Sequence, residues 1–137
     1  MVNRIKYEFL DHTADIKVKI SGKDLTEVFE NSVLALSEYL SSEKKIESKK
    51  VKVINVQGSD TSALLYNFIE EILYLIDSEG FAPARAKVIL RGNNLQAEIS
   101  GDTTLHYHLQ QIKAPTYAEM EIKKDQEGWI AQFVLDV

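Results

Sequence analysis

The apolar residues of this 137-residue chain repeat with two different periods, and the change of period predicts its helices and strands. Apolar positions three or four residues apart at 25–40 and 64–76 are typical of amphipathic helices. Short apolar or alternating runs predict strands at 7–10, 16–20, 51–58, 84–90, 95–100, 103–109, 118–123 and 129–135. Two helices and seven or eight strands, mostly consecutive late in the chain, indicate an α+β fold, a layered sandwich of two helices on a mostly antiparallel β-sheet.

Capping and turn residues indicate where these elements begin and end. Asp24 and Glu27 form a capping-box-like pair, so the first helix is expected to start there and to run to about residue 40. The second helix is expected to start near residue 59 or 60. All six glycines lie at boundaries between periodic segments, with turns expected at 91–94, 101–102 and 124–128 and a lysine-rich loop at 41–50.

Length and composition limit the class of protein. The chain, residues 1–137, fits a single compact domain, with 45% hydrophobic and 27% charged residues. It has no cysteine, which excludes disulfides, thiolate metal sites and cysteine nucleophiles. Sixteen Lys and Arg against twenty-one Asp and Glu give a net charge of −5. Proteins that neutralise a phosphate backbone usually have the opposite balance, so direct nucleic-acid binding is not expected.

The amino terminus and the most hydrophobic stretch bear on location. The first seven residues lack the apolar run of a secretion signal. Asn67, Glu70 and Glu71 interrupt the apolar stretch 63–76, and they would be costly in lipid. We therefore expect a soluble, cytoplasmic protein without membrane partners.

The densest polar cluster lies between two apolar runs, in the sequence DHTAD at 11–15. The carboxylates of Asp11 and Asp15, the imidazole of His12 and a threonine hydroxyl could ligate a metal or perform acid–base chemistry. Asp and Thr also bond locally to backbone amides, so a polar hairpin turn explains the same residues. Spacing alone favours the turn and leaves the site open.

The chain ends in Asp136 and Val137, so a strand that reaches the last residue brings a side-chain and a main-chain carboxylate together. Beside Asp15 they would place three oxygen anions in one spot. Two such charges ~4 Å apart repel by about 4 kcal/mol at an effective dielectric near 20, so the group would require a cation or a lysine. Oxygen ligands without sulfur favour Ca²⁺, Mg²⁺ or Mn²⁺. The simpler alternative is a solvated terminus with nothing bound.

Lys113 begins the sequence KAPTY at 113–117. The residue before a proline is restricted to extended conformations, so Ala114 is expected to be extended and Lys113 to lie where a strand begins. A lysine fixed there could compensate carboxylates or contact a phosphate as a point charge. An ordinary surface lysine is the alternative.

Motifs for enzymatic chemistry are few. His106 and His108 are expected on one face of a strand, but structural zinc normally takes four ligands and no third is evident, so an exposed strand is favoured. The sequence has no glycine-rich phosphate loop, no GxSxG elbow and no HExxH helix. It therefore does not indicate an enzyme with its own organic chemistry.

Taken together, the motifs resemble the archease family over the full length of the chain. The matching sequences are YEFLDHTAD at 7–15, LLYNFIEEILY at 64–74, KAPTY at 113–117 and LDV at 135–137. The order of DHTAD, KAPTY and a final Asp followed by an aliphatic residue is specific. The sequence departs from the family at Ala118, where many members carry a polar residue, so no role is expected for that side chain.

The resemblance implies a non-catalytic activator of an RtcB-type RNA ligase, which acts in tRNA splicing, a step of tRNA processing, and in RNA repair. Archeases promote guanylylation of the ligase's active-site histidine and so allow multiple turnover. The family fold is a strand-helix-strand-strand module inserted in a second like it. Family members bind a divalent ion, often calcium, at an acidic site near the carboxyl terminus.

Carried over motif by motif, the resemblance assigns metal binding to Asp15, Asp136 and the main-chain carboxylate of Val137. It assigns activation or partner contact to Lys113. Asp11 and His12 belong to the same motif and are secondary candidates as direct ligands. The expected cofactor is Ca²⁺, with Mg²⁺ or Mn²⁺ as alternatives.

Two other functions remain open from the sequence. One is a chaperone-like protein-binding module with a purely structural ion, which the acidic composition and the absence of an active-site motif allow. The other is a small metal-dependent hydrolase that uses Asp11, Asp15 and Asp136, which is disfavoured because no general base or positioned lysine pair stands out.

Overall fold

The computed structural model describes residues 5–10 and 15–137. Its elements in chain order are β1 (Tyr7–Leu10), β2 (Asp15–Gly22), α1 (Leu25–Leu40), β3 (Lys50–Gln57), α2 (Thr61–Glu79), β4 (Phe81–Arg91), β5 (Asn94–Thr103), the 3₁₀ helix η1 (Thr104–His106), β6 (Ala114–Asp125) and β7 (Gly128–Asp136).

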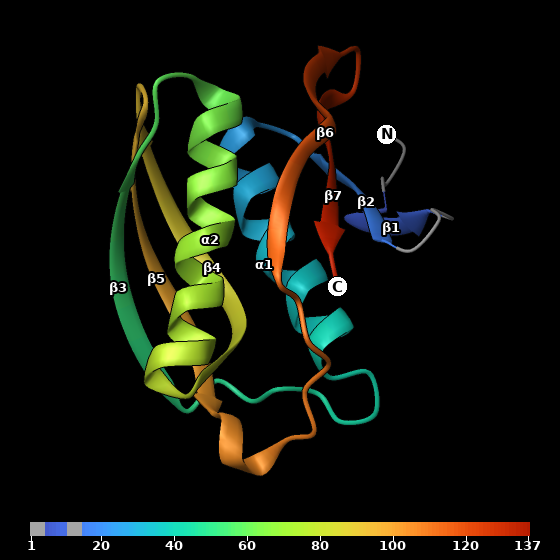
Figure 1. Cartoon of the computed structure of the whole chain (residues 1–137). Coiled ribbons are helices and arrows are strands. Elements are labelled where there is room, and N and C mark those ends of the chain that lie inside the picture. The colour runs from blue at the N-terminus through green and yellow to red at the C-terminus, as the bar shows by residue number, and fades with distance from the viewer. Residues whose placement is uncertain (1–4, 11–14) are drawn as a thin grey trace.

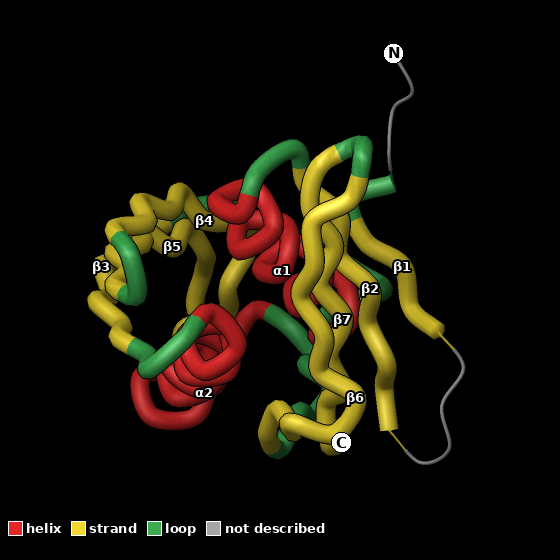
Figure 2. The backbone as a smooth tube through the Cα atoms, turned by 90° about the horizontal axis from the view of Figure 1, so that it is seen from above, coloured by secondary structure: helices red, strands yellow, loops and turns green. Residues whose placement is uncertain are grey.

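The strands form two sheets, and both helices lie between them (Figure 1, Figure 2). The four-stranded sheet has the order β1-β2-β7-β6, and the three-stranded sheet has the order β3-β5-β4. The strand pairs of the described chain are all antiparallel. The predicted α+β class is therefore confirmed, with the strands divided between the two sides of the helical layer.

The two sheets share one topology. β3, α2, β4 and β5 follow one another along the chain and form the three-stranded sheet, in which the first strand pairs with the last. β2, α1, β6 and β7 repeat this arrangement, since β2 pairs with β7 and β6 lies on the other side of β7. The strand-helix-strand-strand module implied by the family resemblance is thus present twice, with one copy inserted between α1 and β6 of the other.

Each helix begins at the aspartate that the sequence indicated. The Asp24 carboxylate accepts a hydrogen bond of 2.8 Å from the Glu27 amide, and the Asp60 carboxylate accepts one of 2.8 Å from the Ala63 amide. Each bond satisfies an amide that would otherwise lack a partner in the first turn. α2 ends at Gly80, whose φ of 61° lies in the left-handed region that glycine adopts without strain. Neither described helix has the length and apolar character needed to cross a bilayer.

The core fills the space between the sheets. α1 packs on β2 and β4, and α2 packs on β3, β4 and β6, so each helix contacts both sheets. The rings of Phe29 and Phe68 join the two helices, with centroids 5.6 Å apart and planes at 57°. Both side chains are fully buried, and burying a side chain of that size contributes roughly 1.5–3 kcal/mol. This packing holds the four-stranded sheet against the two helices.

Two sequence predictions for the segment from the end of β5 to the start of β6 are wrong. The turn expected at 101–102 is part of β5. The glycine at position 101 allows β5 to pack closely on β4, because a Cβ there would collide with the Ala82 carbonyl. The strand expected at 103–109 is η1 followed by an irregular segment, because polar contacts of Asp102 hold the chain in a tight turn. The other predicted strands are present, and several are longer than predicted.

Candidate functional site

The beginning of β2 and the end of β7 meet in the four-stranded sheet. Asp15, the first residue of β2, is directly opposite Asp136, the last residue of β7. The Cβ atoms of directly opposed residues lie roughly 4.5–5.5 Å apart in an antiparallel pair, and their side chains share one face. The early carboxylate and the chain end therefore converge as the sequence suggested. Metal binding by them stays a prediction.

Lys113 lies immediately beside this pair. Ala114, the first residue of β6, is opposite Asp136, and the Lys113 amide donates a hydrogen bond of 2.8 Å to the Asp136 carbonyl. The extended conformation predicted for Ala114 and the position predicted for Lys113, where a strand begins, are both confirmed. Three segments that are far apart in the sequence thus lie side by side: the start of β2, the end of β7 and the residue before β6.

The carboxylates lie on the face of the sheet that is turned away from the helices. Val18 of β2 and Phe133 of β7 are fully buried against the core. Because strand side chains alternate between faces, Asp15 and Asp136 point to the opposite side, toward solvent. Asp136 is exposed and Asp15 is half-buried. Water can therefore reach both carboxylates.

The oxygen donors here fit a hard divalent cation. Asp15 and Asp136 supply two side-chain carboxylates. Participation of Val137 stays a prediction. Ca²⁺ takes about six to eight oxygen ligands, so bound water would complete the shell on this accessible face. Within residues 5–10 and 15–137, no group of three or more His, Cys, Asp or Glu side chains is placed to hold a metal. Asp11 and His12 lie outside the described residues.

A wide bulge in β6 lies next to this site and was not predicted. Thr116 is opposite Val134 and Glu121 is opposite Gln132, so four residues of β6 face a single residue of β7. Glu119, inside the bulge, has a φ of 59°, in the left-handed region where residues other than glycine are uncommon. Nothing in the residue types signals this conformation, since a glutamate in a strand-like run favours no bulge.

The bulge also brings two family motifs into contact. The ring of Tyr117, from KAPTY, stacks on the ring of Tyr66, from the motif on α2, with centroids 4.2 Å apart and planes at 5°. Burial raises the pKa of Tyr66, and the charges of Glu70 and Tyr117 add to this effect. α2 is therefore tied to the segment that carries Lys113.

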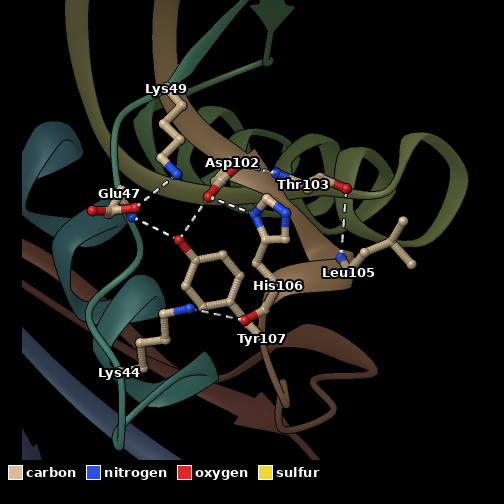
Figure 3. A network of polar contacts seen from close by, with 8 residues as sticks. All are labelled: Lys44, Glu47, Lys49, Asp102, Thr103, Leu105, His106 and Tyr107. Atoms are coloured by element: carbon tan, nitrogen blue, oxygen red, sulfur yellow. Dashed lines mark hydrogen bonds and ion pairs between the residues drawn. The ribbon is translucent and has the colours of Figure 1, made fainter.

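A second polar cluster surrounds the buried carboxylate of Asp102 (Figure 3). The carboxylate contacts His106 Nδ1 at 3.2 Å and accepts hydrogen bonds from the Tyr107 hydroxyl at 2.9 Å and the Thr103 amide at 2.7 Å. Burial acts to raise the pKa of Asp102, but these hydrogen bonds outweigh it and lower the pKa to about 2.

This cluster fastens the loop between α1 and β3 to η1 (Figure 3). The Tyr107 hydroxyl accepts a hydrogen bond of 3.0 Å from the Glu47 amide. Lys44 Nζ lies 4.9 Å from the centre of the Tyr107 ring and donates a hydrogen bond of 3.2 Å to the His106 carbonyl. The arrangement is a structural clamp, because the contacts of Glu47 and Lys44 join the loop between α1 and β3 to the segment around η1.

The prediction that His106 and His108 share a strand face is wrong. His106 belongs to η1 and contacts Asp102, whereas His108 lies in the exposed segment after it. The buried Tyr107 between them explains the difference, since its hydroxyl bonds to Asp102 and draws the chain inward. Among the residues that the structure describes, neither imidazole belongs to a group of three or more possible metal ligands.

The fold and site define a class: α+β proteins in which one strand-helix-strand-strand module is inserted in another and two aspartates oppose each other where β2 begins and β7 ends. The family model described as "Archease protein family (MTH1598/TM1083)" matches residues 7–137. The chain is 39% identical over 140 residues to "Protein archease" of Thermococcus kodakarensis. The aligned region covers 96% of this chain and 99% of the relative. The chain belongs to the archease family.

Two solved structures have the same fold. The solution structure of Methanobacterium thermoautotrophicum protein 1598 superposes with a TM-score of 0.77 at 28% identity, over 96% of this chain and 99% of that chain. The crystal structure of an archease from Thermotoga maritima, described as a possible chaperone, gives a TM-score of 0.64 at 21% identity. It covers 100% of this chain and 98% of that chain and supports the fold alone.

Proposed function

We propose that this protein is a non-catalytic activator of an RtcB-type RNA ligase in tRNA splicing and RNA repair, acting in the cytoplasm. It promotes guanylylation of the ligase and multiple turnover through a divalent-cation site formed by Asp15, Asp136 and the carboxylate of Val137. The observation that carries the proposal is the direct register of Asp15, where β2 begins, with Asp136, where β7 ends. Membership of the archease family supports the proposal, since the family resemblance implies an RtcB-type ligase as the partner.

Each residue of the site has a defined task in this proposal. Asp15 and Asp136 hold a cation that the partner can reach, because Asp136 is exposed. The hydrogen bond from the Lys113 amide to the Asp136 carbonyl fixes the end of β7. When bound, a divalent ion neutralises phosphate charge of the kind that develops in nucleotidyl transfer. The exposed Lys113 side chain contacts an anionic group of the ligase or its nucleotide as a point charge.

The acidic surface favours a transient complex with the ligase. An RNA ligase requires a basic surface for its substrate, and a partner with a net charge of −5 is attracted to that surface. Such attraction raises the rate of association more than the final affinity, and it weakens with salt. A short-lived complex allows RNA to replace the activator once the ligase is guanylylated.

The test is a ligation time course with RNA in excess over ligase, with and without this protein. We expect wild-type protein to sustain turnover beyond the first round and Asp136→Ala, Asp15→Ala and Lys113→Ala to fail to do so. Asp77→Ala is the matched control, because Asp77 is an exposed aspartate on α2. Full stimulation by Asp136→Ala would refute the assignment of the site.

A second candidate is a chaperone-like protein-binding module with a structural ion. The Thermotoga maritima archease is described as a possible chaperone, and Val51, Val53 and Ile89 are exposed on the three-stranded sheet of this chain. A chaperone would suppress aggregation of unrelated heated proteins and would do so in a chelator. An activator would leave those proteins unprotected, and its effect on the ligase would disappear in the chelator.

A further inference from the structure

Lys17 lies on the same face of the four-stranded sheet as the proposed cation site. It follows Asp15 by two residues on β2 and is opposite Val134, two residues before Asp136 on β7. Residues two apart on a strand share a face, and diagonal neighbours across an antiparallel pair lie roughly 7–8 Å apart. The flexible lysine side chain can therefore reach either carboxylate of the site.

The structure instead directs the Lys17 ammonium to the bulge of β6. Lys17 Nζ lies 3.1 Å from Glu119 Oε1, and the Lys17 side chain is only 20% exposed. Val134, directly opposite Lys17 on this outward face, is only 1% exposed, so the face is largely covered at this point. A partly buried ion pair is screened less by salt than one on an open surface.

The backbone conformation at position 119 does not favour a glutamate. Its φ of 59° suits glycine, because glycine lacks the Cβ that makes this region unfavourable. Two bonds hold the bulge in place: Gln132 Nε2 donates to the Glu119 carbonyl at 2.9 Å, and the Ala118 amide donates to Thr116 Oγ1 at 3.0 Å. Strain of this kind persists where its surroundings enforce it, and it often marks a functional constraint.

Other acidic side chains of this face are matched with other lysines. Glu121 pairs with Lys123 at 2.9 Å, and Glu8 is directly opposite Lys19. If Glu119 lost its charge, the Lys17 side chain could instead contact Asp15, two residues along β2, or Asp136, diagonally across on β7.

We propose that Glu119 is a positioning residue that holds the Lys17 ammonium on the bulge and so prevents it from neutralising Asp15 and Asp136. This inference rests on the proposed cation site. A lysine ammonium is a compact, mobile point charge, and between two aspartates it would act as a built-in competitor of a divalent ion. The contact with Glu119 in the bulge keeps the Lys17 ammonium away from the two aspartates.

The first test needs no metal. The crystal structure of metal-free Glu119→Gln should show Lys17 Nζ in contact with the carboxylate of Asp15 or Asp136, and that of the wild-type protein should show it at Glu119. If Lys17 stays at position 119 or extends into solvent in the variant, the inference is wrong. This outcome is independent of whether the protein binds Ca²⁺.

The second test is a double-mutant cycle of Ca²⁺ affinity, measured by isothermal titration calorimetry. We expect Glu119→Gln to weaken binding about tenfold, since a lysine charge then lies beside the ion. Lys17→Met should change the affinity little in the wild-type background and should restore it in the Glu119→Gln background. Such non-additivity is the signature of two residues that act through one contact.

The other outcomes of the cycle separate the alternatives. If the double variant binds as weakly as Glu119→Gln, Glu119 is a direct ligand and the inference is overturned. If Lys17→Met has the same effect in both backgrounds, the charges act only at a distance, and the inference is also overturned. Absence of Ca²⁺ binding by the wild-type protein would refute the cation site, and the metal-free structures would still decide the position of Lys17. Glu79→Gln, which breaks the Lys52–Glu79 pair of 2.7 Å elsewhere, is the matched control.

Discussion

The opposed carboxylates of Asp15 and Asp136 should make the metal-free protein less stable than a variant that lacks one of them. Asp136→Asn keeps the shape of the side chain and removes its charge. Because Asp136 is at the last position of β7 and its side chain is exposed, the substitution opens no cavity in the core. The variant therefore isolates the electrostatic interaction between the two strand ends.

The size of the effect follows from the register. Directly opposed side chains in an antiparallel pair are roughly 5 Å apart, and two like charges at that distance repel by about 0.8 kcal/mol in bulk water and about 3 kcal/mol at an effective dielectric near 20. Solvent reaches Asp136, so the lower figure applies. We expect Asp136→Asn to raise the free energy of unfolding by about 1 kcal/mol, or Tm by roughly 3–5 °C.

Thermal unfolding followed by circular dichroism, with and without Ca²⁺, measures this effect. In excess chelator the variant should unfold at a higher temperature than the wild-type protein. At free Ca²⁺ about a hundredfold above Kd, the wild-type protein should gain about 2.7 kcal/mol, and the variant should gain much less. Asp77→Asn, on the outside of α2, should change neither value. A metal-free Asp136→Asn protein that is less stable than wild type would refute the reasoning.

Three further predictions concern the clamp and the close strand packing. Tyr107→Phe removes the hydroxyl between Asp102 and the Glu47 amide and should lower the unfolding free energy by roughly 2 kcal/mol in urea titrations. The pKa of Asp102 is lowered to about 2 in the folded protein, so its stabilising effect is present above about pH 4 and is lost as the pH falls toward 2. The stability difference between wild type and Asp102→Asn should shrink over that range, and a constant difference would contradict the assignment. Gly101→Ala should be strongly destabilising, because the added Cβ collides with the Ala82 carbonyl; unchanged Tm would show that β4 can move away.

The elements of this fold could be predicted where local chemistry decides them. Asp24 and Asp60 cap the two helices as their sequences indicate, and Gly80 ends the second one. The division of the strands between two sheets could not be read in this way, because it depends on which distant strands pair. The family resemblance implied the duplicated module, but only the pairing of β2 with β7 and of β3 with β5 shows it in this chain.

The irregular segments escaped prediction because long-range contacts decide them. Residues 103–109 alternate like a strand, but the contacts of Asp102 with His106 and Tyr107 turn the chain into η1. The glutamate at position 119 has no local preference for a positive φ, and the bulge around it depends on Gln132 of the next strand.

For the candidate site, the convergence of Asp15, Asp136 and Lys113 could be anticipated, because the motifs lie where strands begin and end. The position of Lys17 on the same face requires the register of β2 with β7. Its contact with Glu119 requires the bulge of β6 as well.

In the proposed function, the acidic strand ends activate a ligase. The most direct measurement is the transfer of labelled GMP from GTP to a purified RtcB-type ligase that has completed one round of joining. We expect renewed labelling with the wild-type protein and none above background with Asp136→Ala, provided that the variant has the circular dichroism spectrum of the wild type. Equal labelling with both proteins would contradict it.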